Sequence, residues 1–141
     1  MIKKEIKEIL AAGQYSCVAA DATICYRATG MGVKPIITPM RRKRDFFAGL
    51  QVGDTIIGKA AALLLVLSGV QFVYGRIMSK AAVAVFEAHD IDYQYEKLVD
   101  FIQNRQLNGL CPLEQAVLEE EDPEAAWYKL EKKIAQLMAE Q

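Results

Sequence analysis

The sequence predicts an α/β protein in which a mixed sheet of about five strands is covered by helices. Two β-prone runs within residues 15–28 surround a polar break at Asp21 and indicate a hairpin. From residue 47 onward the pattern alternates strand, helix, strand, helix and strand, which favours parallel strands joined by right-handed crossovers. With 141 residues, 52% of them apolar, the chain fits one domain. We therefore expect a single three-layer α/β/α sandwich over residues 1–141.

Local signals place the elements of the first half. Apolar residues at helical spacing predict a helix within residues 1–13, and Gly13 ends the pattern. The hairpin strands are expected at residues 15–20 and 23–28. Further along, Pro35 suits the first turn of a short helix or turn-rich connection, and Pro39 is expected to limit its length.

In the second half, a short strand within residues 47–52 is expected to end at Gly53. Asp54 then caps a helix over residues 55–68, which is apolar nearly all round and should be buried on most of its surface. Ser79 is the expected cap of the next helix. The remaining elements are a strand at 70–77, a helix at 80–89, a strand at 90–99 and a helical turn within 97–104.

Two helices are expected near the C-terminus. Cys111 directly precedes Pro112, which is placed at the first position of a short helix over residues 112–119. Asp122 is the expected cap of an amphipathic helix over residues 122–141. The apolar stripe of this last helix consists of Trp127, Leu130, Ile134, Leu137 and Met138.

Composition argues against several classes of partner. Seventeen basic and 18 acidic residues give a net charge of −1, so we expect no binding to nucleic acid or to an anionic membrane. The basic run at 41–44 has no interleaved aromatic residues and is interpreted as a solvated face. The apolar run within 60–70 is about half as long as a membrane span. The N-terminus lacks the pattern of a signal peptide, and three scattered cysteines indicate reduced thiols, so a cytoplasmic protein is expected.

Cys111 is the first candidate functional residue. A thiol at the start of a helix feels the positive end of the helix dipole, which favours the thiolate. Arg105, six residues upstream, would add positive charge. Cys111 is therefore a candidate nucleophile or redox-sensitive thiol. The alternative is a small residue at a helix start that has no chemical role.

A second group of candidates falls where helices follow strands. In open α/β sheets, ligands bind beyond the carboxyl ends of the strands, and five candidates lie there. They are Asp54, Gly58, Lys59, Ser79 and Lys80. Lys59 is expected one turn into its helix, where it would bind a phosphate or extend to the surface. Ala60 replaces the hydroxyl residue of a P-loop, and Ser79 also serves as a plain helix cap.

Several of these stretches resemble one protein family. The stretches "GVKPI", "GDTIIGKAAALLL", "YEKLV" and "GLCPLE" resemble the domain-of-unknown-function 1893 family over about residues 15–120. The resemblance implies a fold like that of cytidine deaminases, an α/β/α sandwich around a mixed five-stranded sheet. Zinc deaminases carry H-x-E and P-C-x-x-C at two helix starts, where this chain has "GDTIIGK" and "MSKAA". The resemblance therefore implies a deaminase-like fold without the zinc site, and we expect no cofactor.

Three functional hypotheses follow. The first is a metal-independent enzyme or redox-responsive protein that uses Cys111, with Asp54 and Lys59 as polar partners. The second is a non-catalytic module that binds a nucleotide-like or other anionic small molecule at the helix starts. The third is an interaction protein whose C-terminal helix docks either a partner or a second copy of this chain. Docking of a second copy would give a homo-oligomer.

Overall fold

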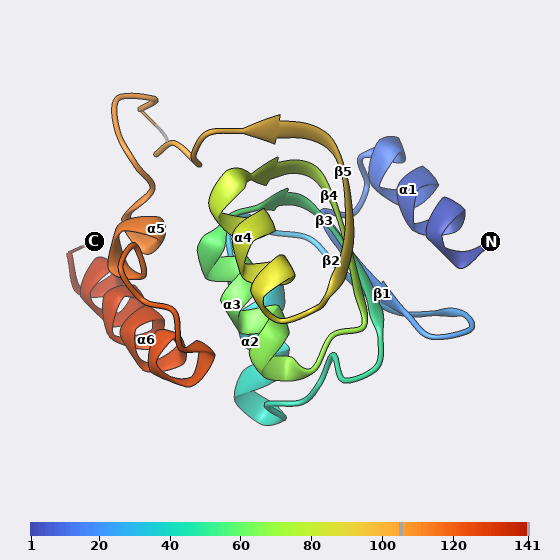
Figure 1. Ribbon diagram of the computed structural model, residues 1–141, viewed down its shortest axis with the longest axis horizontal. Coiled ribbons are helices and arrows are strands. Elements are labelled where there is room, and N and C mark those ends of the chain that lie inside the picture. The colour runs from blue at the N-terminus through green and yellow to red at the C-terminus, as the bar shows by residue number, and fades with distance from the viewer. Residues whose placement is uncertain (105, 141) are drawn as a thin grey trace.

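The computed structural model describes residues 1–104 and 106–140, and it contains a mixed sheet of five strands in the order β2-β1-β3-β4-β5 (Figure 1). The strands are β1 (Cys17–Ala20), β2 (Ile24–Ala28), β3 (Gln51–Ile57), β4 (Phe72–Ser79) and β5 (Asp92–Val99). β1 is antiparallel to both of its neighbours, whereas β3, β4 and β5 are parallel. The predicted hairpin, the parallel half and the α/β class are confirmed.

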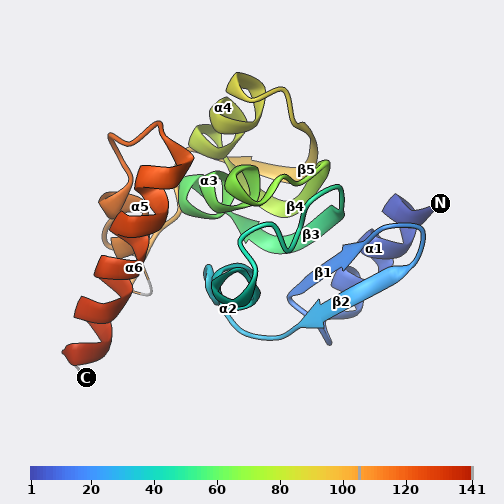
Figure 2. The same ribbon diagram turned by 90° about the horizontal axis from the view of Figure 1, so that it is seen from below.

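Helices lie on both faces of the sheet (Figure 2). They are α1 (Ile2–Ala12), α2 (Lys34–Arg42), α3 (Lys59–Ser68), α4 (Lys80–Ala88), α5 (Pro112–Ala116) and α6 (Pro123–Ala139). α1 packs on β1 and β3 from one side, and α2 and α4 flank α3 on the other. α5 and α6 pack outside α3, so that α6 and α1 lie at opposite ends of the molecule in both views.

Asp54 lies within β3 and does not cap a helix, contrary to the prediction from the sequence. β3 continues through Gly53 and Asp54 to Ile57, because Asp54 pairs with Cys17 on one side and with Gly75 on the other. Hydrogen-bonded ladders on both sides keep the backbone extended, although the Gly-Asp pair suggested a stop. The following helix therefore begins at Lys59 rather than at residue 55, and Lys59 is its first residue.

Pro39 lies inside α2, which continues beyond it to Arg42, although Pro39 was expected to limit the length of this helix. A proline in a helix cannot donate to the carbonyl four residues earlier, which here belongs to Pro35. The Tyr26 hydroxyl donates a 2.6 Å hydrogen bond to this Pro35 oxygen. The hairpin thus satisfies the acceptor that Pro39 leaves free, and the helix continues to Arg42.

Residues 97–99 continue β5 instead of forming the predicted helical turn, because Lys97, Leu98 and Val99 pair with the end of β4. Residues 100–104 form no helix either. The pairing of β3 with β4 and the pairing of β4 with β5 are interrupted at the same position along the strands. Thr55, Arg76 and Glu96 have no sheet partner there. The pairing offset is the same before and after this position, so both ladders are interrupted there without a shift in register.

The C-terminal elements follow their predicted starts. α5 begins after Cys111, although its regular part ends at Ala116. Asp122 caps α6 by accepting a hydrogen bond from the Ala125 N–H, and the buried side chains of Trp127 and Leu130 pack into the protein's own core.

The basic run helps to dock α6. Arg41 donates to the Glu131 carboxylate, and the Arg44 guanidinium lies 4.1 Å from the centre of the Trp127 ring. This run therefore has a structural role. Among the described residues, no helix is long and apolar enough to cross a membrane.

Candidate functional site

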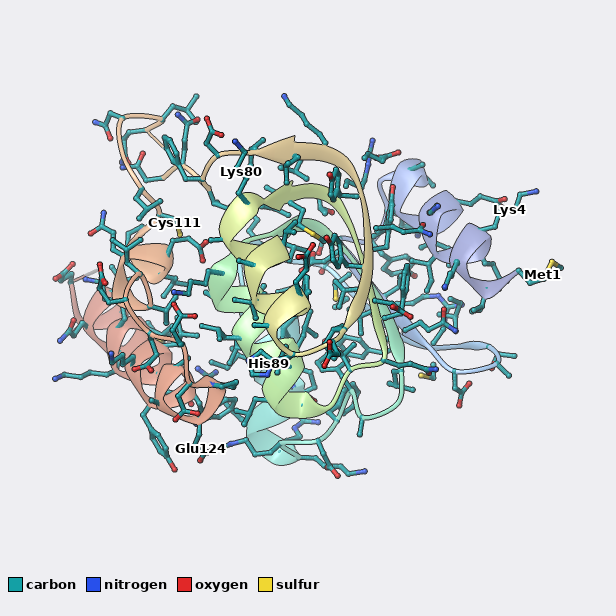
Figure 3. All side chains as sticks on the ribbon, viewed as in Figure 1. Met1, Lys4, Lys80, His89, Cys111 and Glu124 are labelled. Carbon is teal, nitrogen blue, oxygen red and sulfur yellow. The ribbon has the colours of Figure 1, made fainter. Side chains whose placement is uncertain are left out.

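The carboxyl ends of β3 and β4 lead directly into α3 and α4, as predicted for a ligand-binding edge. At the start of α4, the Ser79 hydroxyl accepts a hydrogen bond from the Ala82 N–H at 3.1 Å and so caps the helix. Lys80 lies at the surface, where its ammonium pairs with Asp100 at 2.8 Å (Figure 3). The start of α4 thus has a cap and an exposed cation.

The start of α3 is closed by a carboxylate from a distant part of the chain. Glu114, on α5, accepts the backbone N–H groups of Lys59 at 2.7 Å and Ala60 at 2.8 Å. The first N–H groups of a helix lack partners inside the helix, and its positive end favours an anion. Glu114 is therefore the N-terminal cap of α3, a role that our sequence analysis missed.

Gly58 makes this contact possible. A Cβ atom at Gly58 would collide with the Glu114 carboxylate, and the Gly58 backbone is extended, so it needs no left-handed conformation. Glycine is required here because a side chain would exclude the carboxylate. A glycine at this position would also allow a ligand to approach the backbone closely. In this protein the Glu114 carboxylate occupies that space.

Lys59 contacts the connection between α5 and α6. Its ammonium donates to the Leu118 carbonyl at 2.9 Å and to the Glu121 carboxylate at 3.3 Å. The side chain is largely buried, so these acceptors stabilise a cation that has lost most of its water. Lys59 thus contacts the acidic linker before α6.

Asp54 is buried between the sheet and the helices. Its Oδ1 accepts the Thr55 N–H at 2.8 Å, while Oδ2 has no hydrogen-bond partner among the described residues. Burial raises the pKa of Asp54 well above its ordinary value, and the Thr55 hydrogen bond only partly opposes this shift. Burial, with Asp54 as a second cause, also raises the pKa of the neighbouring Cys17 thiol. Asp54 therefore favours the neutral, protonated form.

Cys111 is half-buried at the start of α5. Its backbone N–H donates to the Ile102 carbonyl at 3.0 Å, but its side chain makes no capping hydrogen bond. The residue lines a narrow pocket of about 40 Å³ together with Gly58, Ala60 and Glu114. Burial raises the pKa of Glu114, although its two N–H partners and Lys59 act in the opposite direction. This pocket therefore combines a thiol with the carboxylate that caps α3.

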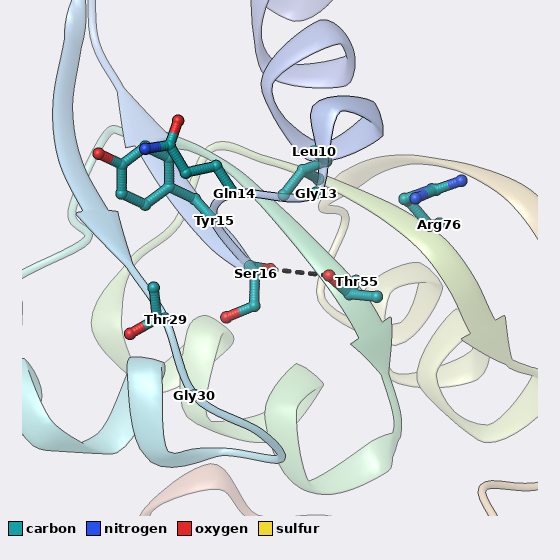
Figure 4. A pocket seen from close by; sticks show the side chains of 9 residues that line it. All are labelled: Leu10, Gly13, Gln14, Tyr15, Ser16, Thr29, Gly30, Thr55 and Arg76. Carbon is teal, nitrogen blue, oxygen red and sulfur yellow. Dashed lines mark hydrogen bonds between the residues drawn. The ribbon is translucent and has the colours of Figure 1, made fainter.

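A larger cavity lies at the same edge of the sheet, on the side of α1 (Figure 4). Its volume is about 300 Å³. Its polar lining residues are Gln14, Tyr15, Ser16, Thr29, Thr55 and Arg76. Thr55 donates its hydroxyl to the Ser16 carbonyl at 3.1 Å, and Arg76 lies on the opposite side of Thr55 from Tyr15. We call this space the polar cavity.

The structure brings only some of the predicted residues together. Gly58, Lys59 and Cys111 converge around Glu114, whereas Asp54 lies in the core and Ser79 and Lys80 belong to the next helix start. Arg105 lies outside the described residues. Within residues 1–104 and 106–140, no group of three His, Cys, Asp or Glu side chains could hold a metal ion.

The buried Asp54 gives a prediction about stability and pH. In the unfolded chain this carboxyl loses its proton near pH 4, whereas the folded protein retains it to higher pH. The wild-type free energy of unfolding should therefore fall above about pH 4, by up to about 1.4 kcal/mol per pH unit, relative to Asp54→Asn. Urea unfolding from pH 4 to pH 8 measures this difference, and the same substitution at the exposed Asp45 is the control. A pH-independent difference between wild type and Asp54→Asn would contradict the account.

Comparison with known proteins identifies the family. The sequence model of one protein family, the domain of unknown function 1893, matches residues 5–134 of this chain. A crystal structure of a protein of this family from Thermotoga maritima is similar with a TM-score of 0.83. That match has 23% sequence identity and covers 92% of this chain and 88% of the other, so it shows a shared fold. No curated protein matches the chain. The chain belongs to the domain-of-unknown-function 1893 family.

Proposed function

We propose that this protein binds a small anionic or hydroxyl-bearing molecule in the polar cavity. The observation that carries this proposal is the cavity itself, about 300 Å³ in volume and lined by residues with hydroxyl, amide and guanidinium groups. Ligand pockets of this size usually combine a shaped wall with a few polar groups that orient the ligand. Its place beside the carboxyl end of β3 is where open α/β sheets bind ligands.

The lining favours an anion. Arg76 donates its Nε to Glu96 at 3.1 Å, and its terminal nitrogens donate no hydrogen bond to the described residues. Those nitrogens suit a phosphate or carboxylate, which guanidinium groups bind with two parallel hydrogen bonds. The hydroxyl groups of Tyr15 and Thr29 would orient the rest of the ligand.

This site replaces the helix starts as the preferred binding location. At the start of α3, Glu114 already supplies the anion, and the Lys59 ammonium is engaged by Leu118 and Glu121. The start of α4 offers the exposed Lys80, which is paired with Asp100 as Arg76 is with Glu96, but Lys80 does not line the polar cavity. Binding of a nucleotide-like anion through Gly58, Lys59, Ser79 or Lys80 therefore has weaker support than binding through Arg76.

We also propose that the fold is of the cytidine deaminase type and that the protein acts in the cytoplasm. The antiparallel β1 beside the parallel β3, β4 and β5 supports this fold. Such a fold implies zinc at the starts of α3 and α4. The residues there are Gly58-Lys59-Ala60 and Ser79-Lys80-Ala81, which do not fit the metal. We therefore propose no step that depends on zinc.

Thiol chemistry at Cys111 is the second candidate function, and one specific observation favours it. Cys111 lines a pocket together with the Glu114 carboxylate, which is a candidate acceptor for the thiol proton. Transfer of that proton would leave the thiolate, which is the nucleophilic form of cysteine.

Ligand binding is tested by thermal unfolding with three probes of increasing size, which are inorganic phosphate, ribose 5-phosphate and cytidine monophosphate. We expect at least one probe to raise the Tm in proportion to the logarithm of its concentration. Arg76→Gln should weaken that binding about tenfold or more, and Thr55→Val should weaken it less. Lys80→Gln removes a cation at the same sheet edge, outside the cavity, and should leave it unchanged. The proposal fails if no probe stabilises the protein or if Arg76→Gln binds like the wild type.

The thiol candidate is tested by mapping iodoacetamide alkylation of the folded protein. The chain provides its own controls, because Cys25 is exposed and Cys17 is buried. An activated Cys111 should react faster than Cys25 although it is less accessible, and Glu114→Gln should change its rate. If Cys111 reacts more slowly than Cys25, and equally in both proteins, it has no special reactivity.

A further inference from the structure

β5 forms one outer edge of the sheet, with no further strand beside it among the described residues (Figure 1). It has eight residues, and six of them are exposed. A long exposed edge presents unpaired N–H and C=O groups, and proteins usually shield such an edge or pair it with another strand. The edge strand at the other side, β2, is shorter and contains one charged residue, Arg27.

The face of β5 toward α4 is apolar. The ring of Tyr95 stacks on Tyr93, and Tyr93 stacks on Phe86 of α4, with centroid distances of 6.4 Å and 6.0 Å. Leu98 is the sheet partner of Met78, whose side chain is fully buried in the core on the same side of the sheet. Tyr95 and Leu98 therefore face the same side, and they are 41% and 38% exposed.

The opposite face of β5 carries two opposite charges in sequence. Tyr95 and Leu98 face one side although they are three positions apart, because their sheet partners do: a Cβ atom at Gly75, the partner of Tyr95, would contact the side chain of Met78, the partner of Leu98. The two residues between them, Glu96 and Lys97, therefore lie on the other side. Both are exposed, and Glu96 keeps its pair with Arg76 at 3.1 Å.

This arrangement is self-complementary. In an antiparallel pair of two β5 strands centred between residues 96 and 97, Glu96 lies opposite the partner's Lys97. By the same symmetry, Tyr95 lies opposite the partner's Leu98. A two-fold axis repeats both contacts, so each face gains two matched cross-strand pairs.

We propose that two copies of this protein associate through β5 in this register and form one continuous sheet. The partner strand would form hydrogen bonds with the unpaired N–H and C=O groups of β5 and would cover part of the Tyr95 and Leu98 side chains. Phe101, which is 50% exposed just beyond β5, lies beside the same interface. The β2 edge lacks such complementary charges, so pairing through β5 is favoured.

Sedimentation velocity of the full chain over a dilution series tests this proposal. The wild type should approach twice the monomer mass with increasing concentration. Lys97→Glu leaves the Arg76–Glu96 pair intact but places like charges opposite each other, and it should raise the dimer Kd about tenfold or more. The double variant Glu96→Lys with Lys97→Glu exchanges the charges but removes the Arg76–Glu96 pair, so it should recover part of the affinity that Lys97→Glu loses.

Glu8→Lys, an exposed charge reversal on α1, is the matched control and should leave the Kd unchanged. The Tm of each variant is measured to confirm that it folds. A wild type that stays monomeric at every concentration overturns the proposal and leaves the edge to a different partner. A dimer that tolerates Lys97→Glu overturns the proposed register.

Discussion

The hydrogen bonds from the start of α3 to Glu114 are the interaction on which the rest of the structure depends. α3 is almost entirely buried, and its N-cap is Gly58, which has no side chain to accept the first N–H groups. Leaving buried N–H groups without acceptors costs about 1–3 kcal/mol each. Glu114 supplies both acceptors from α5, and Lys59 holds the following linker. The same contacts therefore cap the central helix and attach the C-terminal segment to the sheet.

This constraint also determines where a ligand can bind. A helix start at the carboxyl edge of an α/β sheet ordinarily receives an anion from outside, but here the protein fills that position with its own carboxylate. The remaining open polar space lies on the other side of β3, where Thr55 and Arg76 face the polar cavity. Asp54 connects the two regions through its hydrogen bond with the Thr55 N–H.

Signals that act within a few residues were predicted well from the sequence. Gly13 ends α1, Ser79 caps α4 and Asp122 caps α6, as their neighbours along the chain indicated. The role of Glu114 depends on a contact across 55 positions, and the tolerance of Pro39 depends on a hydroxyl from the hairpin. The sequence did contain one signal for the role of Glu114. A buried helix that starts at a glycine has no side-chain cap of its own, so its first N–H groups need an acceptor from another part of the chain.

Amide hydrogen exchange at Lys59 and Ala60 measures whether Glu114 holds both the start of α3 and the C-terminal segment. Glu114→Ala should accelerate exchange at these two amides and along α6, because the cap and the attachment are lost together. Glu119→Ala, an exposed glutamate on the same segment, should change neither. Unchanged protection of Lys59, Ala60 and α6 in a folded Glu114→Ala protein would contradict the account.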